Sequence, residues 1–451
     1  MSLMAEEPES VVQTEADAAA AADVVDITQA LLRIDTSNYG DGSGPGERTA
    51  AEFTAELLRE VGIEPTVFTT TSDLRAGVSA FIPGREPAEP ALLLTGHLDV
   101  VPADESEWSI PPFAGEIDDY GVLWGRGAVD MKDMVGMVLA LVRSWARRGY
   151  QPRRSIALLL TPDEEAGGQH GAHWIVRRRP DLLHGATEAV GEVGGFSVTL
   201  PNGRRIYPIQ TGEKGLAWFT ATLAGTAGHG SLISPDNPVA RLTLGLASLL
   251  SDPYPVHLTE SMRTFVEVVS DLVGEELALD DQARLTEQVG GVARVVGAAT
   301  RTTANPTMLT AGVKHNMVPG KASVGMDLRY LPGGEEAAVE RIRRHLPDGT
   351  ELDYVNQDIA LETGFDGTLV EGMIAALARY DPQGVPVPYL MTGGTDGKAF
   401  HEAGVRYLGF SPLHLDPSLN FWGMFHAPDE RVPVSALQFG VKVLDDFIQR
   451  I

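Results

Sequence analysis

The chain of 451 residues contains no cysteine, which excludes disulfide bonds, cysteine nucleophiles and thiolate metal sites. No apolar run approaches the roughly 20 residues that a membrane-spanning helix needs. Basic residues are also scarce, because 35 lysines and arginines stand against 62 aspartates and glutamates, for a formal net charge of -27. A field of that sign repels nucleic acid and anionic membrane surfaces, so we expect neither as a partner.

Several catalytic signatures are missing as well. The sequence has no phosphate-binding P-loop, and the Gly-Arg-Gly run at residues 125–127 lacks the third glycine of a dinucleotide fingerprint. It also has no Gly-x-Ser-x-Gly elbow of a serine hydrolase. These absences leave metal-assisted chemistry based on histidine and carboxylate side chains to be considered.

The beginning of the chain differs in composition from the rest. Residues 1–23 are rich in alanine and glutamate, with neither a basic segment nor an apolar core, so we expect no signal peptide there. We predict a disordered leader over these residues. The expected absence of a signal peptide and the lack of cysteine together favour a cytoplasmic location.

From residue 24 onward, short apolar runs alternate with helical patterns. Helices are predicted at residues 48–61 and 132–148, and the second is apolar around most of its circumference, as in a well-buried helix. Strands are predicted at residues 78–82, 91–94, 155–160 and 188–190. This alternation predicts an α/β fold with a mostly parallel sheet flanked by helices.

The pattern changes near residue 213. Strands are predicted at 214–224, 308–313, 322–331 and 351–355, and helices at 238–250 and 335–345. Without residues 251–305, which carry helical patterns of their own, the order is β-α-β-β-α-β, the ferredoxin-like split unit. We therefore predict a catalytic domain over residues 24–212 and 357–451. It is interrupted by an α+β lid or dimerisation domain over 213–356, with a helical insertion at about 251–305.

The apolar run at residues 92–96 stops abruptly at His97, and Asp99 follows two residues later. Residues two apart in an extended chain point the same way, so both side chains can face one spot at the carboxyl end of a buried strand. Open α/β sheets place their ligands at that edge. Alone, the pair fits ordinary polar loop chemistry equally well.

Further polar residues follow other predicted strands. Asp130 precedes the buried helix at 132–148, Glu164 and Glu165 follow the strand at 155–160, and Glu192 follows the strand at 188–190 between glycines. A second histidine, His426, lies far downstream. Repetition of this pattern at successive strand ends is hard to attribute to solvated loops.

Imidazole and carboxylate are the ligands that Zn²⁺ accepts when thiolate is absent. Two histidines and three carboxylates suit a two-metal centre in which one carboxylate bridges ions about 3.5–4 Å apart. Asp130, Glu164, Glu165 and Glu192 carry four negative charges, which two divalent ions would cancel. Without metal, four clustered carboxylates could not all stay ionised.

Taken together, the motifs resemble the dinuclear zinc aminoacylase/carboxypeptidase family. This family includes acetylornithine deacetylase, succinyl-diaminopimelate desuccinylase, carboxypeptidase S and carnosinase-type dipeptidases. The resemblance covers nearly the whole chain and rests on GHLDVVP at 96–102, Trp108, Pro112-Phe113, GRGAVDMK at 125–132 and DEE at 163–165. It implies a zinc-exopeptidase-like catalytic domain and a cis peptide bond after Asp130.

The resemblance also implies individual roles. His97 and Glu192 would hold one metal, Glu165 and His426 the other, and Asp130 would bridge them. Asp99 would orient His97. Glu164 would be the general base; the spacing alone does not say which of the two neighbouring glutamates stays free of metal, and only the resemblance selects it. Zinc is favoured by ligand type, although cobalt and manganese also suit these ligands.

The predicted lid supplies further candidates by resemblance. His229, within GTAGHGS at 225–231, would stabilise the oxyanion, in dimeric members across the subunit interface. Asn316 and Arg329 would hold substrate, since a guanidinium grips a free carboxylate in bidentate fashion. Gly394 and Thr395 lie in a glycine loop that would line the substrate. A homodimer through the lid domain is consistent with this resemblance.

The resulting hypothesis is a metal-dependent hydrolase. A metal-bound hydroxide would attack the amide or peptide bond of a small peptide or N-acyl amino acid with a free carboxylate, with Glu164 as general base. One alternative is a non-catalytic metal-binding scaffold on the same fold. Another keeps the site but cleaves a carbamoyl or related amide. The sequence does not choose among dipeptidase, carboxypeptidase, aminoacylase and deacylase.

Overall fold

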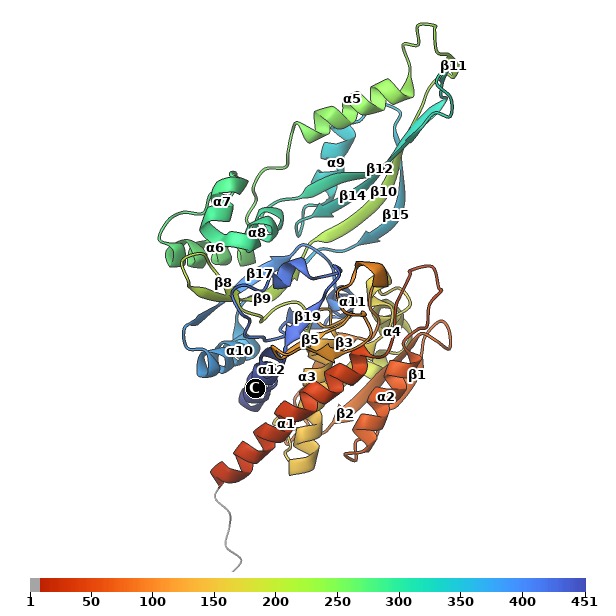
Figure 1. Ribbon diagram of the computed structural model, residues 1–451. Helices are drawn as coiled ribbons and strands as arrows, with labels where there is room; N and C mark the ends of the chain where they lie inside the picture. Colours follow the sequence, from red (N-terminus) through yellow and green to blue (C-terminus); the bar gives the residue numbers. More distant parts are fainter. Residues whose placement is uncertain (1–8) are drawn as a thin grey trace, which may run out of the picture. The chain divides into compact units, whose positions relative to one another are not determined.

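The computed structural model describes residues 9–451 (Figure 1). The chain forms two units. The first comprises Met1–Gln210, Phe365–Pro388 and Thr395–Ile451, and the second comprises Thr211–Gly364 and Tyr389–Gly394. In the described part of the chain, no helix combines the length and the apolar character needed to cross a membrane.

A twisted sheet organises the first unit. Its strands run in the order β1 (Thr66–Thr69), β2 (Ala76–Ile82), β6 (Ile156–Thr161), β3 (Leu92–His97), β7 (Glu188–Gly191), β18 (Arg406–Gly409) and β9 (Arg205–Glu213). The central strands β6, β3, β7 and β18 are parallel, whereas β1, β2 and β9 pair antiparallel to their neighbours. The predicted α/β class with a mostly parallel central sheet is confirmed.

Alternation along the central strands divides their side chains between two apolar layers. Leu92 and Leu94 of β3 belong to one buried cluster, and Leu93 belongs to another. The first cluster includes side chains of α1 (Glu9–Leu32), α2 (Arg48–Arg59), α3 (Lys132–Arg148), α10 (Gly367–Tyr380) and α12 (Val434–Arg450). The second includes side chains of α4 (Ala172–Arg178) and α11 (Gly397–Glu402). Helices therefore cover both faces of the sheet, which is why its central strands are continuously apolar.

Helix α3 is buried over its first four turns, from Lys132 to Trp145, and packs against α1 and α12 (Figure 1). It ends at Gly149, whose left-handed conformation (φ 63°) closes the last turn. A helix apolar on most sides is stable only when other elements surround it, as the sequence pattern predicted.

The predicted disordered leader is wrong where the structure describes it. Helix α1 begins at Glu9, so residues 9–23 are helical, while residues 1–8 of that prediction lie outside the described residues. Ala20 and Val24 are buried, and the Asp23 carboxylate accepts hydrogen bonds from Arg143 and Arg147. Ala18, Ala19 and Ala22 are exposed, so this alanine-rich stretch is ordered as a helix although only a few of its side chains are buried.

The second unit contains a four-stranded antiparallel sheet in the order β12 (Thr303–Ala311), β14 (Lys321–Tyr330), β10 (Gly215–Ala224) and β15 (Glu351–Asp358). Helices α5 (Pro238–Leu250) and α9 (Glu335–His345) contribute to its apolar core. The first strand in sequence, β10, lies between the third and the fourth, which is the topology of the split β-α-β-β-α-β unit. Between α5 and β12 the chain forms α6 (Glu260–Val273), α7 (Gln282–Val289) and α8 (Ala293–Ala299).

Eight further strands complete the description. β4 (Glu116–Ile117), β5 (Val122–Trp124) and β19 (Arg431–Pro433) form a small antiparallel sheet. β11 (Gly228–His229) pairs with β13 (Met317–Val318). The remaining strands are β8 (Val198–Thr199), β16 (Leu361–Glu362) and β17 (Gly384–Met391).

Candidate metal centre

The carboxyl ends of the parallel strands of the first unit bring the candidate residues together. His97, the last residue of β3, lies beside Thr161, the last residue of β6, and Leu94 of β3 lies beside Val190 of β7. The turn after β6 and the residue after β7 therefore meet His97 at one edge of the sheet. Ligand sites of open α/β folds lie at this edge.

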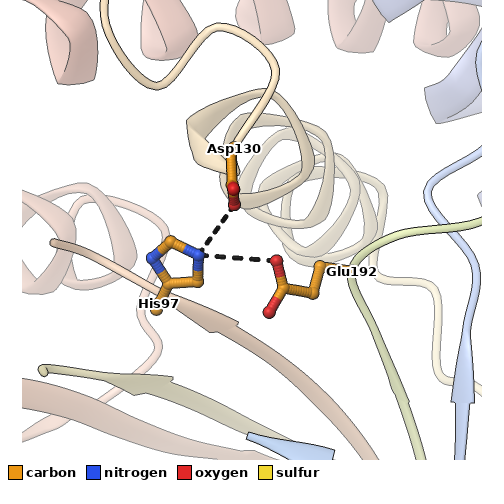
Figure 2. Close-up of side chains that lie close together, drawn as sticks. All are labelled: His97, Asp130 and Glu192. Atoms are coloured by element: carbon orange, nitrogen blue, oxygen red, sulfur yellow. Dashed lines mark hydrogen bonds and ion pairs between the residues drawn. The ribbon is translucent and has the colours of Figure 1, made fainter. Parts of the chain in front are cut away.

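His97, Asp130 and Glu192 form one group of side chains (Figure 2). The His97 Nε2 atom lies 3.0 Å from Asp130 Oδ1 and 3.5 Å from Glu192 Oε2. All three residues are buried, and their nearest ligand atoms lie within 4.8 Å of one another. The Asp130–Met131 peptide bond is cis, as the resemblance predicted.

Asp130, Glu165 and His426 form a second group. The His426 Nε2 atom lies 3.1 Å from Glu165 Oε2 and 3.3 Å from Asp130 Oδ2. The Val101 amide donates to the other Glu165 oxygen at 3.2 Å. Asp130 thus turns one carboxylate oxygen toward each histidine. His426 differs from the other members because 57% of its side chain is exposed.

Glu164 belongs to neither group, although its Oε2 atom lies 3.8 Å from His97 Nε2. Its side chain is only 14% exposed. Of the two neighbouring glutamates, Glu165 therefore contacts His426 within its group, whereas the Glu164 carboxylate lies beside His97 and belongs to neither group. The assignment of Glu165 to a metal and of Glu164 to proton transfer stays a prediction of the resemblance.

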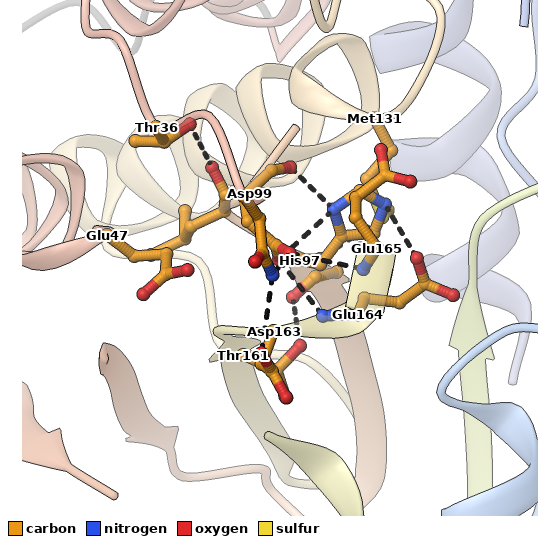
Figure 3. A network of polar contacts seen from close by, with 12 residues as sticks. Thr36, Glu47, His97, Asp99, Met131, Thr161, Asp163, Glu164 and Glu165 are labelled. Atoms are coloured by element: carbon orange, nitrogen blue, oxygen red, sulfur yellow. Dashed lines mark hydrogen bonds and ion pairs between the residues drawn. The ribbon is translucent and has the colours of Figure 1, made fainter. Parts of the chain in front are cut away.

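Asp99 acts on the centre through two different groups, its backbone carbonyl and its carboxylate (Figure 3). Its backbone carbonyl oxygen lies 2.9 Å from His97 Nδ1, whereas its carboxylate is 3.7 Å from the same nitrogen. The carboxylate instead accepts hydrogen bonds from the backbone amides of Glu164 and Glu165, each at 3.1 Å. The expected orientation of His97 thus comes from the carbonyl, and the carboxylate fixes the turn that carries both glutamates.

Burial and crowding shift the pKa values of these groups. Burial raises the pKa of Glu192 to about 8. The pKa of Glu164 is raised well above its usual range, mainly by burial and to a lesser extent by the negative charge of Glu192. Hydrogen bonds with Asp130 and Glu165 raise the pKa of His426 to about 10. Burial alone would lower the pKa of His97, but the charge of Glu192 and the hydrogen bond with Asp130 raise it well above its usual value. Without a cation, the centre retains protons at neutral pH.

The donor set fits a pair of divalent cations. Each group offers one imidazole nitrogen and carboxylate oxygens, the ligand types that Zn²⁺ accepts. Asp130 is shared between the groups. Buried carboxylates that resist ionisation next to one another need a compensating positive charge, and divalent cations would supply it.

The second unit brings His229 and Asn316 together on exposed backbone. His229 lies in β11, opposite Met317 of β13, and the Gly230 amide donates to the Asn316 carbonyl oxygen at 2.9 Å. The Ser231 amide donates to His229 Nδ1 at 3.2 Å. Because that nitrogen accepts, a neutral His229 carries its proton on Nε2, which leaves an N–H donor available.

Arg329 lies on β14, where the structure already gives it partners. Its Nε atom donates to Asp327 Oδ1 at 2.8 Å, and its guanidinium lies 5.7 Å from the ring centre of Trp218. These contacts hold the side chain partly buried, at 22% exposed. A carboxylate ligand would have to bind the remaining edge of the guanidinium.

Gly394 belongs to the second unit and Thr395 to the first. Thr395 is buried, and its hydroxyl accepts a hydrogen bond from the Gly397 amide at 3.0 Å. The next residue, Asp396, was not among the predicted site residues. Its carboxylate accepts a hydrogen bond from Thr161 at 2.5 Å, and burial raises its pKa to about 7. An acidic residue directly after a Gly-Gly-Thr loop was the available signal.

Comparison with known proteins agrees with this arrangement. The family described as Peptidase family M20/M25/M40 matches residues 93–450. The chain is 28% identical over 429 residues to mouse N-fatty-acyl-amino acid synthase/hydrolase PM20D1, covering 88% of this chain and 82% of that protein. It is 28% identical over 406 residues to human aminoacylase-1, covering 88% and 89%.

Among solved structures, an M20 family metallo-carboxypeptidase from Sulfolobus solfataricus superimposes with a TM-score of 0.69 at 19% identity. The match covers 95% of this chain and 99% of that one. The predicted resemblance to metal-dependent aminoacylases and carboxypeptidases is therefore confirmed. The family match covers far more than half of the sequence, and the chain belongs to Peptidase family M20/M25/M40 as a metallopeptidase or amidohydrolase.

Proposed function

We propose that this chain hydrolyses the amide bond of small peptides or N-acyl amino acids at a centre formed by His97, Asp130, Glu165, Glu192 and His426. The observation that carries the proposal is the sharing of Asp130 between two histidine-carboxylate groups. When bound there, two divalent cations, zinc by ligand type, would acidify a water and polarise the scissile carbonyl.

Glu164 is the proton carrier in this proposal. A carboxylate oxygen of Glu164 accepts a proton from the attacking water and then delivers it to the nitrogen of the leaving amine. Its carboxylate lies beside His97 without belonging to either ligand group, so its lone pairs are available for this transfer. Burial raises the pKa of Glu164 above its usual range, which is the direction that favours retention of a proton for the leaving amine.

His229 would donate its Nε2 proton in a hydrogen bond to the oxyanion of the tetrahedral intermediate, from the same chain or from a second copy. Ser231 supports this role because its amide fixes the tautomer that places the proton on Nε2. Arg329 and Asn316 would bind the free carboxylate of the substrate, with Gly394 and Thr395 lining it. A substrate of this class accords with relatives named as an aminoacylase and an N-fatty-acyl-amino acid synthase/hydrolase.

The test pairs metal analysis with a substrate panel of dipeptides, N-acetyl and N-fatty-acyl amino acids, and N-carbamoyl amino acids. We expect two equivalents of divalent metal per chain and turnover of at least one amide class. Replacement Glu164→Gln should keep both equivalents while lowering kcat by about 10³-fold or more. Two bound metals without turnover across the panel would favour the non-catalytic scaffold. Selective turnover of the carbamoyl substrates would favour the alternative of a carbamoyl-amide hydrolase.

A further inference from the structure

Behind the metal centre lies a buried amide whose hydrogen-bonding capacity is fully used. The Asn38 Nδ2 group donates to Asp99 Oδ2 at 2.9 Å and to Asp163 Oδ1 at 3.3 Å. Its Oδ1 atom accepts from the Gly40 amide at 3.0 Å and from Arg75 Nη2 at 2.6 Å. Asn38 is only 4% exposed, so these protein partners replace water.

Arg75 fixes the orientation of that amide. Its guanidinium donates to Asn38 Oδ1 through Nη2 and to Glu47 through Nη1, and Nε lies 3.7 Å from Asp163 Oδ1. Arg75 is 7% exposed and Glu47 is fully buried. A guanidinium carries its donors in a rigid planar fork, so one side chain can fix three partners at once.

The element held by these contacts is the turn that carries both glutamates of the centre (Figure 3). Asp163, at its start, has a left-handed backbone (φ 71°), and its carboxylate accepts from the His170 amide at 2.8 Å. The next two amides donate to Asp99. Asn38 thus contacts both Asp99, which accepts from those amides, and Asp163, the first residue of the turn. None of the three polar residues Asn38, Arg75 and Glu47 belongs to the ligand groups.

We propose that Asn38 and Arg75 are positioning residues that lock Asp99 to the turn at residues 163–165 and so set where Glu164 and Glu165 lie relative to the metal centre. The inference rests on the proposed function in that it assigns Glu165 to a metal and Glu164 to proton transfer. Partners of this kind, which orient ligands without touching the metal, typically change metal affinity or activity by about 10–100-fold when replaced.

The chain offers a matched control for Arg75. Arg154 is also 7% exposed, and it donates to Glu188 at 2.6 Å and to the carbonyl oxygens of Pro90 and Ala91. It therefore lies at the amino end of β3, whereas His97 is at the carboxyl end. Arg75→Lys and Arg154→Lys both replace a planar fork with a single ammonium, so both should lower the thermal unfolding midpoint.

Titration of the metal-free protein with Co²⁺ separates positioning from stability, because the visible absorption of Co²⁺ reports its ligand geometry. We expect Arg75→Lys to weaken one of two Co²⁺ equivalents by about 10-fold or more and to change its spectrum. Arg154→Lys should leave both affinities and the spectrum unchanged. The proposal would be overturned if both variants lost the same stability and both bound Co²⁺ with the affinities and the spectrum of the wild type.

A second pair of variants keeps the test decisive if Arg75→Lys does not fold. Asn38→Asp keeps the shape of the side chain but turns its donor into a carboxylate oxygen that faces Asp99 and Asp163. It should weaken the same Co²⁺ equivalent. Adding Asp163→Asn reverses the donor and acceptor at one of these contacts and should restore part of the affinity. No loss with Asn38→Asp, or no recovery in the double variant, would count against the proposal.

The Co²⁺ readout does not depend on turnover. A wild-type protein that binds two Co²⁺ ions but cleaves no substrate refutes the proposed function and leaves the positioning test intact. Conversely, a hydrolase whose Asn38→Asp and Arg75→Lys variants bind Co²⁺ and turn over as the wild type refutes only the positioning role.

Discussion

The two units hold their candidate residues in opposite ways. In the first unit, His97, Asp130 and Glu192 are between 1% and 8% exposed, and His97 contacts both carboxylates directly. In the second unit, His229 and Asn316 lie on an exposed pair of short strands and are held mainly by backbone hydrogen bonds and by Ser231. The first set is organised by burial within its own unit, and the second is organised by contacts with residues close by in sequence or across two short strands.

This difference separates two kinds of functional residue. Buried charged groups must be paired or must bind a cation, because an uncompensated charge in a protein interior is costly. An exposed histidine carries no such requirement, so the role of His229 depends on what it meets during turnover. Dimerisation through the second unit stays a prediction for the same reason.

The largest expected effect tests the shared ligand. Asp130→Ala removes the carboxylate common to both groups, so we expect loss of both metal equivalents and a fall in kcat of roughly 10⁴-fold or more toward the uncatalysed rate. Asp381→Ala is the control, because Asp381 is buried in the same unit but pairs with Arg205 and Tyr207. Metal analysis and steady-state kinetics would measure both; retention of two metals by Asp130→Ala would remove its bridging role.

The second-largest expected effect concerns the exposed candidate residues of the second unit. His229→Ala should lower kcat by about 10²–10³-fold, as expected for loss of one oxyanion donor, without changing metal content or the unfolding midpoint. His257→Ala changes another exposed histidine of the second unit and should leave kcat unaltered. If His229→Ala instead lost metal or stability, the contrast between the two units would be wrong.

A third prediction uses the protons held by the metal-free centre. The pKa values of about 8 for Glu192 and about 10 for His426 exceed their ordinary values, so metal must displace protons at pH 7. Apparent metal affinity should therefore rise with pH, by up to about tenfold per pH unit for each displaced proton, until pH exceeds those pKa values. Calorimetry in buffers of different ionisation enthalpy counts the protons released; a value of zero at pH 7 would contradict the predicted protonation.

The smallest expected effect concerns stability in the second unit. Lys214 is buried, and its ammonium donates to the carbonyl oxygens of Ala298 and Arg301 and to the hydroxyl of Thr303. Burial lowers the pKa of Lys214 to about 7, whereas a lysine in the unfolded chain keeps its ordinary pKa of about 10.5. Between these values the unfolded state binds more protons, so the free energy of unfolding should rise with pH by at most about 1.4 kcal/mol per unit.

Urea unfolding at pH 7, 8 and 9 would measure this contribution as the difference between the wild type and Lys214→Met. The variant loses three hydrogen bonds and should be less stable throughout, by a margin that widens as pH rises. Lys321→Met, at an exposed lysine of the same unit, should show no widening. A constant margin for Lys214→Met would mean that Lys214 keeps its ordinary pKa in the folded protein.

Some elements were predictable because their signal is local. The boundaries of α3, from Lys132 to Arg148, and of α5, from Pro238 to Leu250, match the predicted helices, since apolar periodicity and the flanking glycine or proline mark them. Strand β1 was missed because four residues of mixed polarity carry no distinct period. The alanine-rich start of α1 was misinterpreted because composition alone does not reveal a helix that packs on α3.

Four of the five candidate ligands were identifiable because each follows an apolar strand or precedes a buried helix, and parallel topology brings strand ends together. His426 has no such local signal and was identified by resemblance. The residues proposed to position these ligands were not identifiable from the sequence. Asn38 lies in a polar loop and Arg75 directly precedes β2, and nothing in the local sequence indicates that Asn38 contacts Asp99 or that both residues contact Asp163.

The sequence by itself determined the α/β class, the family, and the set of histidines and carboxylates from which a metal centre could be built, because these follow from periodicity and from residues at strand ends. Tertiary structure decided which atoms do the orienting: the carbonyl of Asp99 faces His97, and its carboxylate holds the turn at 163–165. Hydrogen bonds between segments distant in sequence depend on side-chain direction and burial, and those are fixed only when the sheet and its helices pack together.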